Sequence, residues 1–351
     1  MWARWLIPSG AAVAIGIVVA LTASISDDRP AGYRAQVSVT ASDDSPRYLL
    51  TTEVPEQAGA GQQVAIREVA TGRVIQTTRF PAGVTEFTDL AATGDGHTFF
   101  LTASVHDRYW QIFRLHLNGP RLGGKGPAAI PEAVRYGRVK NPVGLAVTQD
   151  GASVAFGVNH MEVSGKYGET PGEIDVLNLA TGRRQVWSTK VWGQLGDLSL
   201  SDNGMRLAFN WSSGSDGGGD GVRILDTTKP GELLQSARLV VPSTGAFSQP
   251  DHPMISPDGA TLTIVAAQRD QQKLWSRLIE VATATGRQLR VLYQEPNLGG
   301  FGQGGYPFDA ICRSGRYVLI VDARRTLQID TTTGRTVRLP YPDANPDQVA
   351  C

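Results

Sequence analysis

One short pattern recurs along the chain and constrains its fold more than any other feature. The pattern is an apolar alternating run, a turn that contains glycine, and a second apolar run. The turn glycines stand 53 to 56 residues apart, at Gly96, Gly151, Gly204, Gly259 and Gly315. This period, with strand-type alternation on both sides of each turn, predicts a repeat protein built from β-sheet units.

A second type of turn lies between successive copies of the first. It reads Thr-Gly-Arg at 71–73, 181–183, 285–287 and 333–335, so each unit has four strands. Apolar runs at 47–52 and 64–69 predict one further unit at the start. Because a four-stranded unit cannot bury both of its faces alone, the units must stack. We predict an all-β propeller of about six four-stranded blades, with seven as the alternative.

The phrases Ile255-Ser256-Pro257-Asp258-Gly259 and Leu179-Ala180-Thr181-Gly182-Arg183 carry a resemblance. They are similar to the WD40-like (TolB-type) β-propeller repeats of membrane-anchored bacterial proteins. The resemblance covers nearly all of the chain after its first residues, and it implies the fold but not the function. The Gly-His and Trp-Asp pairs of eukaryotic WD40 units are missing, so their polar triad is not expected.

The first residues differ in kind from the repeats. No charged residue occurs in 5–26, which is long enough to cross a bilayer at roughly 20 residues. Arg4 precedes this run and Asp27 and Asp28 follow it, which predicts a cytoplasmic N-terminus and a cell-membrane protein whose C-terminal domain is extracytoplasmic. The expected organisation is a cytoplasmic stub (1–4), a transmembrane helix (5–26), a linker (27–46) and the propeller (47–351). A cleaved signal peptide is the alternative to a retained anchor.

The two ends of the propeller are expected to meet. The final segment, 347–351, resembles the start of an inner strand at 309–312, so we expect it to supply the inner strand of the first blade. The alternative donor of that strand is 36–40. In the first arrangement the only two cysteines, Cys312 and Cys351, lie on inner strands of neighbouring blades and are candidates for a disulfide.

The charge balance and the motifs exclude several classes of function. Lys and Arg total 33, as do Asp and Glu, so the chain has no general attraction for nucleic acid and none is expected as a partner. The sequence contains no Gly-x-Ser-x-Gly, His-Glu-x-x-His, Walker or Cys-x-x-Cys motif. No catalytic residue, cofactor or metal is therefore assigned.

One polar group is nonetheless placed at the mouth of the central channel. Asp89, Asp197, His252 and Asp309 occupy nearly equivalent places on the inner strands. Such a ring of carboxylates with a histidine can bind a divalent metal, as in propeller lactonases. Polar residues at these places also commonly bond to neighbouring backbone amides, which is the simpler interpretation.

The loops indicate which face binds. The short Asp-Gly and Thr-Gly-Arg turns share one face, whereas the long loops lie on the other and carry aromatic residues. The candidate anchors are Tyr167, Trp211, Phe301 and Tyr306. The alternative for each is a ring that fills a gap between blades. The leading hypothesis is a non-catalytic scaffold that binds an unknown protein or small ligand outside the cytoplasm; a metal-dependent hydrolase or lactonase is the alternative.

The topology can be tested with a reporter that is active only outside the cytoplasm. Fused after Arg29, the reporter should be active and should remain with the membrane fraction, because the uncharged run is long enough to stay inserted. Release of the mature domain into the medium would instead identify a cleaved signal.

Overall fold

Short turns with a repeated hydrogen-bond pattern build the sheets. In the first turn of a blade, a Ser or Thr hydroxyl donates to an Asp or Asn two residues later, as from Thr148 to Asp150 at 2.7 Å and from Ser256 to Asp258 at 2.6 Å. The acceptor side chain also accepts the backbone N–H of the residue just before the next strand, Ala152 or Ala260, at 2.9 Å in both turns. Glycine completes the turn with a positive φ, 69° at Gly151, which is left-handed backbone that glycine adopts freely.

The computed structural model describes the chain from residue 45 onward, with gaps. The described residues are 45–53, 63–78, 80, 82–106, 109–118, 121–122, 127–130, 136–137, 140–160, 170–213, 220–243, 248–270, 273–296, 310–322, 325–340 and 348–351. They belong to one unit, residues 41–351. Within this part of the chain no helix has the length and apolar character that a membrane span requires. The predicted anchor at 5–26 lies outside the described residues.

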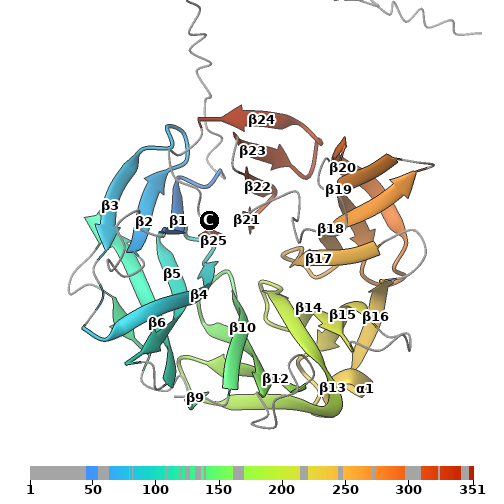
Figure 1. Ribbon diagram of the computed structural model, residues 1–351, viewed down its shortest axis with the longest axis horizontal. Helices are drawn as coiled ribbons and strands as arrows, with labels where there is room; N and C mark the ends of the chain where they lie inside the picture. The colour runs from blue at the N-terminus through green and yellow to red at the C-terminus, as the bar shows by residue number, and fades with distance from the viewer. Residues whose placement is uncertain are drawn as a thin grey trace, which may run out of the picture. The chain divides into compact units, whose positions relative to one another are not determined.

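The strands form six blades arranged as a ring (Figure 1), so the six-bladed prediction is confirmed and the seven-bladed alternative is wrong. Blade 1 contains, from the centre outward, β25 (Gln348–Ala350), β1 (Tyr48–Glu53), β2 (Gln63–Glu68) and β3 (Val74–Thr78). Blade 2 contains β4 (Val84–Ala92), β5 (Thr98–Val105) and β6 (Tyr109–Asn118), and its outer position is divided among β7 (Arg121–Leu122), β8 (Ala128–Ala129) and β9 (Tyr136–Gly137).

Blades 3 and 4 share a long strand. Blade 3 contains β10 (Lys140–Val147), β11 (Ser153–His160), β12 (Thr170–Asn178) and the first half of β13 (Arg184–Leu200). Blade 4 contains the second half of β13, β14 (Arg206–Ser212), β15 (Gly221–Asp226) and β16 (Ala237–Pro242), with the short helix α1 (Leu233–Ser236) before β16. The outer strand of one blade thus runs directly into the inner strand of the next.

Blades 5 and 6 have the regular four strands. Blade 5 contains β17 (Ser248–Ile255), β18 (Thr261–Asp270), β19 (Lys273–Ala282) and β20 (Gln288–Pro296). Blade 6 contains β21 (Ala310–Ser314), β22 (Tyr317–Asp322), β23 (Arg325–Asp330) and β24 (Thr336–Leu339).

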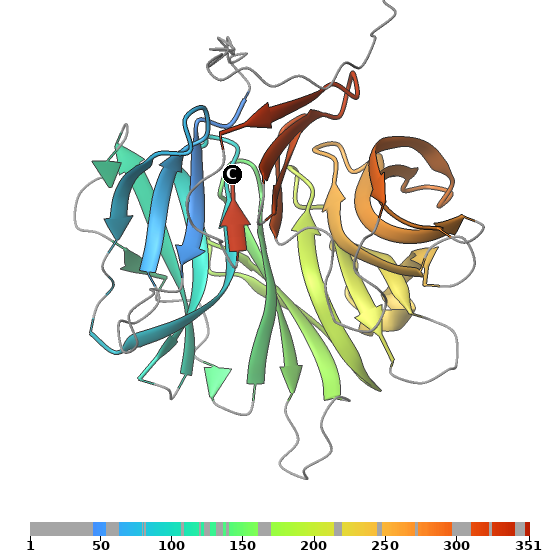
Figure 2. The same ribbon diagram turned by 45° about the horizontal axis from the view of Figure 1, so that its top comes forward.

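The C-terminal strand closes the ring, as predicted. β25 pairs antiparallel with β1, joining Leu50 to Ala350, Thr51 to Val349 and Thr52 to Gln348. Figure 2 shows this strand, in red, beside β1 in blue. Blade 1 therefore combines segments from near both ends of the propeller. The alternative donor, 36–40, lies outside the described residues.

The core is divided among the junctions between blades. Each of the six junctions contains a separate cluster of buried apolar side chains. At the junction of blades 3 and 4, for example, Trp187 and Ile174 pack against Phe209 and Leu207, and all four are fully buried. Burial of the apolar sheet faces between neighbouring blades is the main contribution to the stability of the ring, at about 25 cal/mol per Å² of apolar surface.

Polar side chains on outer strands add bonds across several junctions. The indole N–H of Trp187 donates to the Lys229 carbonyl of blade 4 at 2.9 Å. Arg238 of blade 4 donates to the Thr283 carbonyl of blade 5, and Arg290 of blade 5 donates to the Thr331 carbonyl of blade 6. In each case the acceptor lies in the turn that leads to the outer strand of the next blade. The outer strand of one blade therefore bonds to the same part of the next blade at each of these junctions.

A candidate functional site in the central channel

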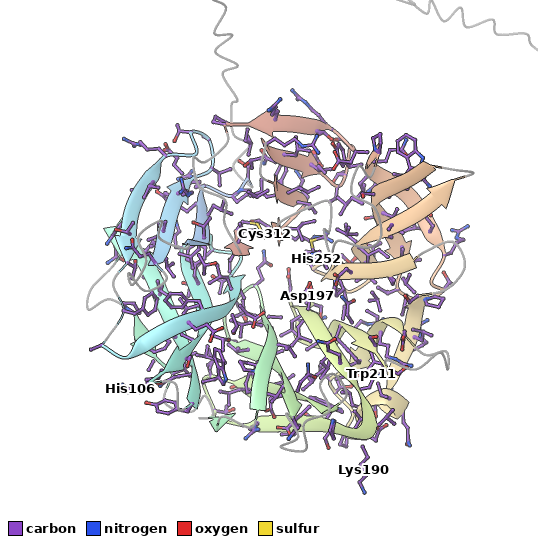
Figure 3. All side chains as sticks on the ribbon, in the orientation of Figure 1. His106, Lys190, Asp197, Trp211, His252 and Cys312 are labelled. Carbon is purple, nitrogen blue, oxygen red and sulfur yellow. A yellow bond between two sulfur atoms is a disulfide. The ribbon has the colours of Figure 1, made fainter. Side chains whose placement is uncertain are left out.

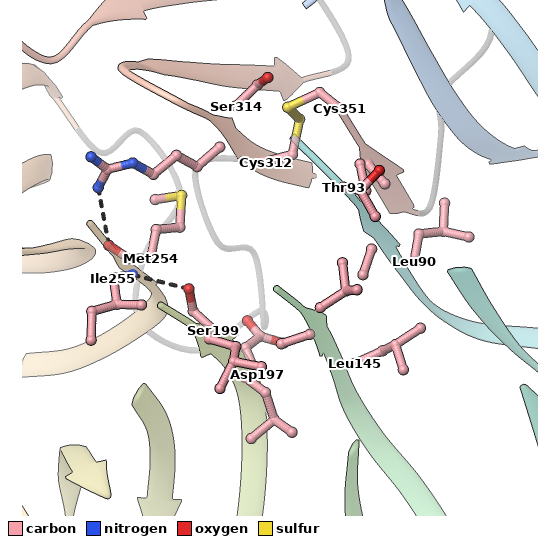
Figure 4. Close-up of a pocket in the computed structure, with 18 of the residues that line it drawn as sticks. Leu90, Thr93, Leu145, Asp197, Ser199, Met254, Ile255, Cys312, Ser314 and Cys351 are labelled. Carbon is pink, nitrogen blue, oxygen red and sulfur yellow. Dashed lines mark hydrogen bonds between the residues drawn. A yellow bond between two sulfur atoms is a disulfide. The ribbon is translucent and has the colours of Figure 1, made fainter. Parts of the chain in front are cut away.

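The six inner strands surround an open channel of about 260 Å³. It has two ends, which we name by the backbone that borders them. At the crossing end the chain passes from the outer strand of one blade to the inner strand of the next, and at the turn end the inner strands enter their Asp-Gly or Asn-Gly turns. Leu90, Leu145 and Ile255 are among the apolar residues of the wall between them (Figure 4).

Four inner strands are irregular at one shared level near the crossing end. That level lies four residues before the Ser or Thr of each first turn, and it is occupied by Asp89, Gly144, Asp197 and His252. The strand register shifts immediately at or beside each of these positions. β-Bulges re-aim side chains, so the irregularities turn this level of the inner strands toward the channel.

Glycine at the blade 3 position serves close packing. Gly144 has a φ of 74°, and a Cβ there would lie 2.8 Å from the side chain and 2.9 Å from the backbone N of Leu198. Its backbone N–H donates to Asp89 Oδ1 at 3.0 Å. At this level blades 2, 4 and 5 carry polar side chains, whereas blade 3 contributes the backbone N–H of Gly144, which binds the carboxylate of blade 2.

Asp197 and His252 form an ion pair across blades 4 and 5. His252 Nδ1 lies 2.6 Å from Asp197 Oδ2, and the two labelled side chains lie together at the centre of the ring (Figure 3). Burial opposes charge on both groups. The hydrogen bond and charge of Asp197, helped by the charge of Asp251, outweigh it and raise the pKa of His252 to about 9, while His252 lowers the pKa of Asp197. The pair is charged at neutral pH.

Asp89 has the opposite behaviour. Burial, together with the charge of Asp197, raises the pKa of Asp89 to about 7, although the Gly144 N–H opposes the rise. Asp89 can therefore gain or lose a proton near neutral pH, unlike an ordinary aspartate. The crossing end combines a fixed ion pair with one carboxylate of adjustable charge.

Asp251 also belongs to this site, although the sequence interpretation did not include it. Donor atoms of Asp197, Asp251 and His252 all lie within 4.8 Å of one another. Two prolines, Pro250 and Pro253, flank the Asp-His pair, and His252 has a φ of 48°. This irregular backbone places adjacent residues on one side of the strand, which strict alternation would not do.

Carboxylate oxygens and an imidazole nitrogen are a donor set that suits a divalent transition metal. In the present arrangement His252 Nδ1 is occupied by Asp197, and Asp251 accepts hydrogen bonds from Asn210 Nδ2 and the His252 N–H. A metal at this point would have to displace the imidazole proton. The three residues could hold a metal, and they are also well satisfied by one another.

The turn end has a polar group that sequence reasoning missed. Arg313 of blade 6 donates to the Met254 carbonyl of blade 5 at 3.3 Å and to the Thr263 hydroxyl at 3.4 Å. Burial lowers the pKa of Arg313 and raises that of Asp202, which also lines the channel. The position of Arg313 directly after Cys312 carried no signal of a bond between blades.

The predicted site residues have different outcomes in the structure. Asp89, Asp197 and His252 do converge, whereas Asp309, Tyr167, Phe301 and Tyr306 lie outside the described residues. Cys312 and Cys351 are joined in a disulfide.

Trp211 does not present its ring to a partner. It is only 3% exposed and belongs to the core between blades 3 and 4. Gly172 and Gly193 make room for it, because a Cβ at either position would lie within 3 Å of the indole. Its role is the alternative one considered for these aromatics, filling a gap between blades.

The comparisons with known proteins agree on the fold. No family model matches the sequence, and no curated protein matches it. TolB from Acinetobacter baumannii is similar in structure, with a TM-score of 0.58 and 15% identity over 88% of this chain and 67% of TolB. A chain of a nidogen/laminin complex has a TM-score of 0.55 and 13% identity, covering 86% of this chain and 97% of its own length.

An enzyme is also among the similar structures. The oligogalacturonate lyase from Vibrio parahaemolyticus has a TM-score of 0.52 and 12% identity over 84% of this chain and 74% of the lyase. At these identities the likeness shows the fold alone. The protein is a six-bladed β-propeller whose structural neighbours include TolB-type propellers, as the sequence resemblance implied.

Replacing Asp89 tests the electrostatics of the crossing end. Between pH of about 4 and about 7 the folded wild type keeps a proton that the unfolded chain has lost, so its stability falls as pH rises. Asp89→Asn cannot ionise. Its melting temperature relative to wild type should therefore increase over this interval and level off above a pH of about 7.

Asp95→Asn is the matched control for this measurement. Burial works against the Asp95 charge, but hydrogen bonds from Thr93, His97 and Thr98 prevail and lower its pKa to about 2. Its carboxylate contributes stability that is present above a pH of about 4 and lost as pH falls, so this variant should become less stable than wild type as pH rises from 2 to about 4. A pH-independent difference between Asp89→Asn and wild type would show that Asp89 titrates normally.

Proposed function

We propose that this protein is an extracytoplasmic recognition module, anchored in the cell membrane through residues 5–26, that binds a protein or small ligand at the crossing end of its channel. One observation carries the proposal. Polar side chains from blades 2, 4 and 5 converge at one end of an open cavity that is lined by both polar and apolar residues. A concave site with a few fixed polar groups is the usual form of a binding site.

Preorganisation supports this function. Asp197 is held by His252, and Asp89 is held by the Gly144 N–H, so both carboxylates have defined positions before a ligand arrives. Both carboxylates belong to inner strands, β4 and β13, whose blades pack against a neighbour on each side. Groups that need no reordering lose less entropy on binding. The nidogen/laminin complex offers a parallel, because there the same fold is found in a complex of two proteins.

Site-specific photocrosslinking in living cells tests the proposed face. A photoreactive residue replaces Glu86 or Gln194, two exposed residues near the crossing end of β4 and β13. Matched controls replace Arg183 and Arg287, which are exposed in the turns of the opposite face. Adducts are expected from 86 and 194 and not from 183 and 287, and His252→Gln should weaken them. Adducts from 183 and 287 alone would contradict the assignment of the face.

A metal-dependent hydrolase or lactonase is the second candidate, favoured by the three donor atoms of Asp197, Asp251 and His252 within 4.8 Å. The lyase among the similar structures is a precedent for catalysis on this fold. Metal analysis of the purified chain separates the candidates. One divalent ion per wild-type chain that is absent from Asp251→Asn would favour the enzyme. As the control for folding, the variant and the wild type should have the same melting curve in the presence of a chelator. The recognition module predicts no such ion.

A further inference from the structure

The disulfide lies at the one junction where the ring is closed by the end of the propeller. Cys312 belongs to β21, the inner strand of blade 6, and Cys351 directly follows β25, the inner strand of blade 1. Their Cα atoms are 5.9 Å apart. The bond therefore joins the inner strands of blades 6 and 1, in addition to the stretch 340–347 that follows β24 and leads into β25 in the sequence.

Few backbone hydrogen bonds hold β25 in place. It has three residues and pairs with β1 at three positions, whereas β1 pairs with β2 at six. The inner strands β4, β10, β17 and β21 have nine, eight, eight and five residues. Short strands with few backbone bonds open at low free energy. The disulfide is thus a principal restraint on the strand that completes blade 1.

The packing of β25 shows what its release would open. Val349 lies in the cluster between blades 6 and 1, together with both cysteines, while Ala350 lies in the cluster between blades 1 and 2. The strand is shared by two junctions. Release of β25 would uncover the inner edge of β1 and part of the apolar faces on both sides of blade 1. The four clusters at the junctions of blades 2 and 3, 3 and 4, 4 and 5, and 5 and 6 would stay complete.

The sulfur atoms are approached from inside the ring. Cys312 is 9% exposed and Cys351 is 3% exposed, and both residues line the central channel. Figure 4 shows the disulfide at the channel wall, close to Ser314. The channel is therefore the side from which a small dithiol would approach the bond.

We propose that the disulfide between Cys312 and Cys351 is a redox-operated latch, whose reduction by a dithiol releases β25 and opens the ring between blades 6 and 1. One thiolate of the dithiol attacks a sulfur of the bond and forms a mixed disulfide, and the other cysteine leaves as a thiolate. The second thiolate of the reductant then displaces the attached cysteine. The dithiol is oxidised by two electrons to its disulfide, and its two protons end on Cys312 and Cys351.

This latch goes beyond the proposed function and does not depend on it. It concerns the wall of the channel at blades 6 and 1, whereas recognition is assigned to groups of blades 2, 4 and 5 at the crossing end. A failed latch would leave the photocrosslinking result unchanged, and a failed crosslinking experiment would leave the latch intact.

Hydrogen–deuterium exchange tests the latch on the full chain, purified in a mild detergent, with and without dithiothreitol. Reduction should remove protection from peptides that contain β1 and β25, and peptides that contain β11, β14 and β19 should keep theirs. Cys312→Ser combined with Cys351→Ser should exchange like the reduced wild type and should not respond to dithiothreitol. The thiol state is measured by mass on the same samples.

Three results would overturn the latch. In the first, the bond is reduced and β1 and β25 stay protected, so that the disulfide does not hold the strand. In the second, protection is lost in all blades, so that the bond supports the whole fold and does not control one junction. In the third, the bond remains oxidised in the native protein after incubation with dithiothreitol, so that a dithiol does not reach it from the channel.

Discussion

Every blade in this ring depends on a neighbour on each side, because its two sheet faces are both apolar. An open row of six blades would leave one face uncovered at each end, and those two faces can be buried only against each other. The pairing of β25 with β1 and the cluster between blades 6 and 1 accomplish this. In chain order the closing strand forms last, and without it the first blade lacks its inner strand and blade 6 lacks part of its neighbour.

The channel site follows from the same geometry. Inner strands of a propeller approach one another around the axis, so equivalent positions of different blades come close together although they are far apart in sequence. Asp89 and Asp197 are brought together in this way, and their repulsion is one reason that Asp89 keeps its proton up to a pH of about 7. His252 forms its ion pair with Asp197. Burial and this repulsion therefore make the crossing end less stable electrostatically, and carboxylates perturbed in this way are common at functional sites.

Much of the fold could be predicted from turn spacing alone. Each Asp-Gly or Asn-Gly turn needs a residue that tolerates positive φ, and each falls between two alternating apolar runs. Four-stranded blades could therefore be read from the chain, and their number could be placed at about six, with seven as the alternative. The equivalence of Asp89, Asp197 and His252 also follows, because each stands four residues before the Ser or Thr of its turn. The C-terminal strand was recognisable because it repeats the start of an inner strand.

The rest depends on contacts that no local pattern records. Asp251 joins the site only because β17 is irregular there, and strict alternation would point it away from His252. Trp211 stands near a long loop in the sequence, yet the space left by Gly172 and Gly193 buries it. Arg313 fastens blade 6 to blade 5 through carbonyl and hydroxyl acceptors that any sequence would offer.

Thermal unfolding of a chain that ends at Asp347 tests most directly whether closure by β25 supports the ring. The comparison is made with the intact chain under non-reducing conditions, in which the disulfide keeps β25 in place, so the difference measures the loss of the closing strand together with its disulfide. Deleting Val349 and Ala350, both nearly fully buried, should cost about 2 kcal/mol or more in the free energy of unfolding and lower the melting temperature by several degrees. If the shortened chain melts at the same temperature as the intact, disulfide-bonded chain, the C-terminal strand does not close the ring.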